Sequence, residues 1–170
     1  MNRNQLCLFV ISAAVAVAAG CAPSPTVDEG PTNEEIMQST GLTVAEATRV
    51  AAANLSVAVG VPLDPARERV VKVGCRTDPE SLMSIGPPYR VRLSHEVAAP
   101  SPDVLAEAMA RVEKLTDRGF ELQPRTPNDQ TPEDRTYQDD KGYTVITSTS
   151  VMVLGGPGLT IYSNSPCAAE

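Results

Sequence analysis

The sequence predicts an α+β fold, a two-layer sandwich in which helices pack on one face of an antiparallel sheet. Its periodic segments run in the order helix, strand, strand, helix, and then three or four strands joined by short turns. Short connections favour antiparallel neighbours, and such a sheet commonly carries helices on one face and leaves the other to solvent. The part of the chain that follows the N-terminal segments, about 140 residues, suits a single domain.

The first long helix is marked at both ends. Thr43 and Glu46 have the spacing of a capping box, apolar residues follow at helical spacing, and Gly60 ends the pattern. A short helical turn, capped by Thr32 or Asn33, is expected just before this helix. The N-terminal part of the domain is therefore predicted to be helical.

The second long helix has the clearest signals in the chain. Ser101 before Pro102 is typical of a helix N-terminus, and an apolar stripe at helical spacing follows as far as Leu115. Gly119 ends the helix, and Leu115 and Phe120 occupy the two positions that touch across a Schellman cap. The chain is therefore expected to turn back at Phe120 into a strand.

Strands are predicted where apolar and polar residues alternate. The predicted strands are 71–75, 89–97, a short one from 120, 135–138, 143–154 and 159–163. Proline and glycine place the connections, which are loops at 78–88 and 124–134, a hairpin turn at 139–142 and a second turn at 155–158. The chain is expected to close with Ser165, Pro166 and Cys167 after the last strand.

The N-terminus has the layout of an export signal. Arg3 precedes an apolar run from Leu6 to Ala19, and Gly20 follows. The run has 14 residues. A transmembrane helix needs about 20, so we expect the run to be cleaved. The predicted organisation is a signal peptide over 1–20, a lipidated cysteine with a flexible tether over 21–31, and one α+β domain over 32–170.

Cys21 directly follows Ala18, Ala19 and Gly20, and a stretch rich in Pro, Ser, Thr and Gly comes next. This arrangement resembles a bacterial lipobox, although the position three before the cysteine, usually Leu, is Ala18. The resemblance implies a diacylglyceryl and fatty-acid (palmitate) modification of Cys21, cleavage before it, and a lipid-anchored position at the cell membrane on the extracytoplasmic side. The alternative is a plain secreted protein in which Cys21 is an incidental thiol.

In outline the chain is similar to small actinobacterial envelope lipoproteins. The shared features are the lipobox, the low-complexity segment after it, Gly-Phe after a helix and a terminal Ser-Pro-Cys. That family has no common enzymatic activity, so the resemblance implies a cellular location and a lipid anchor but no reaction.

The charge of the chain bears on its partners. Without residues 1–20 the chain has 13 basic and 21 acidic side chains, a net charge of −8, because only Arg3 is lost. Such a surface repels nucleic acid and anionic headgroups, and the chain has no Trp to stack on bases. The membrane is expected as a partner only through lipid on Cys21, and an envelope protein or a small ligand is the second expected partner.

Two cysteines remain after Cys7 leaves with the signal peptide and Cys21 takes lipid. We expect Cys75 and Cys167 to pair, since two thiols in an oxidising compartment usually do, and two separate buried thiols are the alternative. No metal or other cofactor is expected, because two distant cysteines and a single histidine are too few ligands.

No set of residues predicts catalysis. Ser94, His95 and Glu96 have the residue types of a hydrolase triad, but neighbours on a strand point to opposite faces. The carboxylate pairs at 133–134 and 139–140 lack the further oxygens of a calcium loop and are interpreted as solvated turn residues. We therefore expect no catalytic residues and no enzymatic activity.

Lys72, Arg90 and Arg92 are the best candidates for a binding surface. They are predicted to lie together on the sheet face away from the helices, as a basic cluster in an acidic chain. Any ligand contact is expected there and not in a cleft, and a simply solvated face is the alternative. The sequence thus predicts a membrane-anchored, non-enzymatic binding or assembly module of the cell envelope, with an envelope hydrolase or a lipid carrier as alternatives.

Overall fold

The computed structural model describes residues 29–129, 131–151 and 157–170. Within them, six strands form one antiparallel sheet in the order β1-β2-β6-β5-β4-β3. The strands are β1 (Val71–Thr77), β2 (Ser84–Ala98), β3 (Glu121–Leu122), β4 (Arg135–Gln138), β5 (Thr144–Val151) and β6 (Pro157–Ala168). The long strands β2 and β6 lie side by side in the middle of the sheet.

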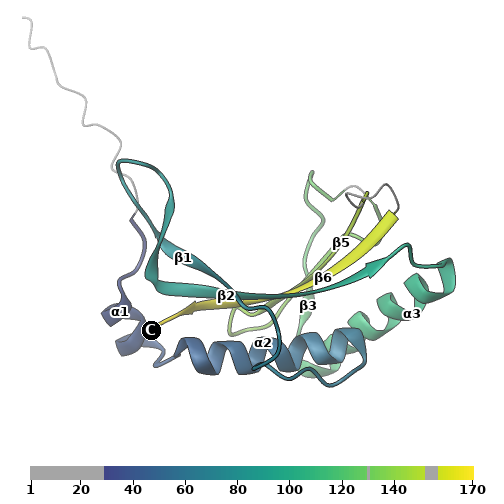
Figure 1. The fold of residues 1–170 in the computed structure, drawn as a ribbon, viewed down its shortest axis with the longest axis horizontal. Coiled ribbons are helices and arrows are strands. Elements are labelled where there is room, and N and C mark those ends of the chain that lie inside the picture. The colour runs from purple at the N-terminus through teal and green to yellow at the C-terminus, as the bar shows by residue number, and fades with distance from the viewer. Residues whose placement is uncertain (1–28, 130, 152–156) are drawn as a thin grey trace, which may run out of the picture.

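Helices cover one face of this sheet, which confirms the predicted α+β two-layer sandwich (Figure 1). The helix α2 (Val44–Val59) lies against β2 and β6, and α3 (Pro102–Glu113) packs beside α2 and continues into the 3-10 helix η1 (Lys114–Arg118). The short helix α1 (Asn33–Ser39) lies next to the C-terminus, where the backbone N–H of Glu170 donates to Asn33 Oδ1 at 2.9 Å.

The hydrophobic core lies between α2 and the middle of the sheet. Four alanines of α2 face it, and such small side chains let the helix backbone approach the strands closely. Larger apolar side chains fill the remaining space. Fully buried members include Leu55, Val91, Leu93, Val112, Leu115, Leu159 and Ile161.

The helix ends lie where their caps were predicted, although only the Thr43 half of the predicted capping box forms, because Glu46 pairs with Arg49. The N-caps are Thr32, Thr43 and Ser101. Ser101 Oγ accepts a hydrogen bond from Val104 N at 3.3 Å, as its position before Pro102 predicts. Gly119 ends η1 with a φ of +83°, and Phe120 N donates to Leu115 O at 3.2 Å. This last bond completes the predicted Schellman cap and turns the chain into β3.

The strand β2 is longer than predicted. It begins at Ser84, inside the loop expected at 78–88, and runs through Pro87 and Pro88, each of which follows a cis peptide bond. The pairing of β2 with β6 begins only at Tyr89. The two prolines therefore have a partner strand on one side only, and proline is tolerated at such an edge.

The strand β6 is also longer than predicted. It includes Pro166 and Cys167, which were expected to follow the last strand at 159–163. The register with β2 shifts between Asn164 and Cys167, so an extra residue of β6 bulges at the proline. Of the expected turn at 155–158 and the expected strand at 143–154, residues 152–156 lie outside the described part.

The domain begins before residue 32. The carbonyl of Glu29 accepts a hydrogen bond from Thr77 N at 2.9 Å, and its carboxylate pairs with Arg76 at 2.8 Å. Residues 29–31 therefore belong with β1, whereas the tether was predicted to run through residue 31. The rest of that predicted tether, residues 21–28, lies outside the described part.

Candidate functional site

The three basic residues predicted as one cluster are divided between the two faces of the sheet. Lys72 is directly opposite Val91 in the β1–β2 pair, and opposite residues share a face. Val91 is buried in the core, so Lys72 lies on the helix side, where it pairs with Glu170 at the edge of the sheet. The prediction that Lys72 joins Arg90 and Arg92 on the open face is therefore wrong.

Arg90 and Arg92 do share the open face. Both are exposed, and Arg92 lies opposite Asn164 of β6. Arg92 Nε donates to Asn164 Oδ1 at 2.8 Å, and the guanidinium carbon lies 5.6 Å from the centroid of the Tyr162 ring. These contacts hold Arg92 against the sheet, but both partners are neutral and Arg92 keeps its charge, so the open face presents two of the three predicted basic side chains.

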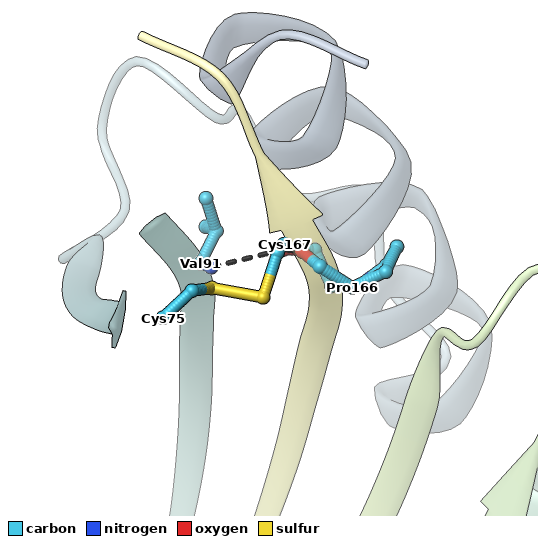
Figure 2. The surroundings of a disulfide bond; sticks show 5 residues. Cys75, Val91, Pro166 and Cys167 are labelled. Atoms are coloured by element: carbon cyan, nitrogen blue, oxygen red, sulfur yellow. Dashed lines mark hydrogen bonds between the residues drawn. A yellow bond between two sulfur atoms is a disulfide. The ribbon is translucent and has the colours of Figure 1, made fainter. Parts of the chain in front are cut away.

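Cys75 and Cys167 form the predicted disulfide, with their α-carbons 6.1 Å apart. The bond joins β1 to β6, two strands that are separated in the sheet by β2. Figure 2 shows the bond beside Val91 of β2, whose backbone N–H donates to Ser165 Oγ at 2.9 Å. The disulfide and this hydrogen bond together fix the C-terminal end of β6 to the first two strands.

A pocket of about 520 Å³ opens between α2, the end of η1 with the residues after it, and the turn between β4 and β5. We call it the hairpin pocket. Its lining is more apolar than polar and comes from segments far apart in the sequence. The apolar lining residues are Leu42, Val50, Phe120 and Pro166. Pockets that bind small molecules in proteins have this size and this character.

The two carboxylates that line the hairpin pocket, Glu46 and Asp139, accept hydrogen bonds from neighbouring residues. Glu46 accepts from Arg49 Nε at 2.9 Å and from its Nη2 at 2.5 Å, which lowers the pKa of Glu46. Asp139 Oδ1 accepts from the backbone N–H groups of Tyr143 at 2.7 Å and Lys141 at 3.1 Å. Both carboxylates thus stabilise the walls of the pocket.

Two cations that line the same pocket, Arg118 and Lys141, are not paired with a carboxylate in the described part of the chain. Within the described residues, neither Arg118 nor Lys141 forms an ion pair, and Arg118 donates only to the carbonyl of Ala53, at 3.3 Å. Neither cation is therefore held in an ion pair by a side chain of this part of the chain, although the charges of Glu46 and Asp139 line the same pocket.

Two further polar side chains line the pocket from the core side. Asn54 is 4% exposed, and its Nδ2 has no hydrogen-bond partner within the described part. The Tyr143 side chain is buried, and burial raises the pKa of its hydroxyl, with a smaller contribution from the charges of Glu46 and Asp139. Tyr143 therefore remains a neutral phenol at physiological pH, able to donate a hydrogen bond.

One of the carboxylates predicted to be solvated is buried. Asp134 accepts from Thr149 N at 2.7 Å through Oδ1 and from Thr131 N at 2.9 Å through Oδ2. It fastens the loop before β4 onto β5, which is a structural role that the polar sequence around it did not indicate. Asp139 and Asp140, in contrast, lie in the predicted turn and are at least partly exposed.

Within the described residues, no three His, Cys, Asp or Glu side chains gather closely enough to hold a metal ion. In the same part of the chain, no helix is both long and apolar enough to cross a membrane. Comparison with known proteins adds no relative, because no protein-family model, curated protein or solved structure matches the chain.

Proposed function

We propose that this chain is a lipid-anchored, non-enzymatic binding module on the extracytoplasmic side of a bacterial cell membrane, and that it binds a small apolar acid. The lipobox-like residues 18–21 after a short apolar run support the anchor. One observation supports the binding role. The hairpin pocket combines an apolar lining with two cations that form no ion pair in the described part of the chain.

The chemistry of the pocket restricts the ligand. An apolar body can pack against Phe120 and Val50, while a carboxylate faces Lys141 and Arg118. Although Glu46 and Asp139 are engaged, their charges still act over the width of the pocket. A ligand with one negative charge is therefore expected to bind more tightly than a dianion or polyanion. A neutral analogue should also bind more weakly, because it cannot form charge-assisted hydrogen bonds with Lys141 and Arg118.

Phenylacetate is a suitable probe of this pocket, because it joins one ring to one carboxylate. In an NMR titration we expect it to shift the amide resonances of Phe120 and Tyr143, and benzyl alcohol, its neutral counterpart, to shift them less. Lys141→Glu should weaken phenylacetate binding roughly tenfold or more, since a hydrogen bond to a charged group is worth about 1.5–3 kcal/mol.

The matched control for this test is Lys114→Glu, which makes the same change of charge at an exposed lysine of η1. That variant should bind phenylacetate with nearly the affinity of the unchanged protein. Equal weakening by both variants would mean that only the overall charge matters, and the absence of shifts at the pocket would refute the binding site.

The anchor makes a separate prediction. The chain expressed in full in a bacterium should be recovered with the membranes, and intact mass should show a diacylglyceryl group on a chain that begins at Cys21. Cys21→Ala should carry no diacylglyceryl group, because the thioether to the lipid needs the cysteine sulfur, and intact mass of the variant tests this. Recovery of unmodified Cys21 from exported protein would contradict the proposed anchor.

A further inference from the structure

The loop between β1 and β2 exposes large apolar side chains. We call residues 78–85 the hairpin tip. Within it, Leu82 is 67% exposed, Met83 65% and Ile85 39%. Single exposed apolar residues are common on protein surfaces, but three within four positions form a patch, and such patches mark contacts with a partner or a membrane.

The hairpin tip has a defined shape that holds these side chains outward. Leu82 N donates to Asp78 O at 2.8 Å, and Asp78 N donates to Met83 O at 2.9 Å. Asp78 Oδ1 also accepts from the backbone N–H of Ser81 at 2.8 Å. Leu82 has a φ of +57°, a conformation in which glycine or asparagine is favoured. A leucine kept there at a conformational cost, with its side chain in solvent, points to a function for the side chain.

The hairpin tip also lies where the chain arrives from the predicted anchor. Glu29, the first described residue, is hydrogen-bonded to Thr77, the residue just before the tip. The eight residues from Cys21 to residue 28 can span at most about 29 Å. If lipid holds Cys21 in a membrane, the hairpin tip is therefore within reach of that membrane, whereas α3 lies at the opposite end of the molecule (Figure 1).

We propose that the hairpin tip inserts Leu82 and Met83 into the headgroup–acyl boundary of the membrane that holds Cys21. The inference rests on the proposed anchor. The lipid holds the chain at the membrane, and the hairpin tip adds a second contact that fixes the orientation of the domain. Asp78 and Glu80 place negative charge at the tip, so zwitterionic headgroups suit it better than anionic ones.

A tryptophan introduced at the tip can test this insertion directly, because the chain contains no Trp. The Met83→Trp variant is expressed in full, isolated from bacterial membranes and reconstituted in phosphatidylcholine vesicles with brominated or unbrominated acyl chains. We expect its emission to shift to shorter wavelength in both and to lose most of its intensity in the brominated vesicles. Val104→Trp, at an exposed apolar position of α3, is the matched control and should show neither effect.

Flotation and intact mass of the same samples separate failure of the anchor from failure of the insertion. If the Met83→Trp protein floats with the vesicles and its tryptophan is not quenched, the hairpin tip does not insert. If Cys21 carries no lipid, the proposed anchor fails, and the insertion is then decided after coupling Cys21 of the same chain to a maleimide lipid in the vesicles. A shift to shorter wavelength without quenching by bromine would indicate burial against protein and would also overturn the membrane contact.

Discussion

Replacing Cys75 and Cys167 together with alanine is expected to lower the free energy of unfolding by about 4–5 kcal/mol, the upper value of the chain-entropy model for a long loop. The bond closes a loop with a sequence separation of 92 residues, which contains α3 and every strand except β1 and the end of β6. Small domains are typically stable by about 5–15 kcal/mol, so the variant should be only marginally folded. Urea unfolding followed by circular dichroism measures the loss.

Dithiothreitol provides the control for this prediction. Reduction of the unchanged protein should lower the midpoint of unfolding to nearly that of the double variant, while the double variant should not respond to the reductant. If the unchanged protein keeps its midpoint after mass spectrometry has shown that both thiols are reduced, the disulfide contributes little, and the contacts between β6 and its neighbours hold the sheet by themselves.

The parts of this fold that the sequence predicted correctly depend on local interactions. The caps at Thr43 and Ser101 and the reversal at Gly119 involve residues within a few positions of one another, so their patterns are complete in a short stretch of sequence. The fold class follows from the order of such elements. The disulfide was predicted for another reason, which is that Cys75 and Cys167 were the two cysteines left to pair.

The wrong placement of Lys72 shows where local patterns fail. Val71 and Val73 alternate with Lys72, which predicts that the valines face the helices. The register with β2 instead places Val71 opposite Arg92, and Val71 is 41% exposed on the open side. β1 is an edge strand, and Lys72 on its helix-facing side is exposed to solvent, where a lysine costs little. Only the pairing of β1 with its neighbour reveals this reversal.

The hairpin pocket could not be predicted from the sequence, for a similar reason. Its walls come from α2, from the residue after Gly119, from the β4–β5 turn and from the end of β6, which are separated by tens of residues. The polar members look like ordinary surface residues in the sequence. The capping box predicted at Thr43 and Glu46 is only half formed, because Glu46 pairs with Arg49, and nothing in the sequence indicated that pairing.

Leu55→Ala is expected to cost about 2–5 kcal/mol of the free energy of unfolding. Leu55 is fully buried in the middle of α2, and the other core-facing residues of this helix are mostly alanines. The variant therefore removes the largest apolar side chain that α2 contributes to the core. Because β2 and β6 are fixed by pairing on both sides, the neighbouring structure cannot close the cavity fully, and the upper half of the range is expected.

Leu82→Ala provides the matched control, since it makes the same chemical change at a leucine that is 67% exposed. Both residues keep a β-carbon after the change, so the backbone conformation at Leu82 is strained to a similar extent before and after. We expect the control to change stability by less than about 0.5 kcal/mol. Parallel urea titrations of the two variants give the comparison, and equal losses would mean that α2 does not pack on the sheet as described. A large loss for Leu55→Ala alone would locate the stabilising contacts of the sandwich between α2 and the central strands.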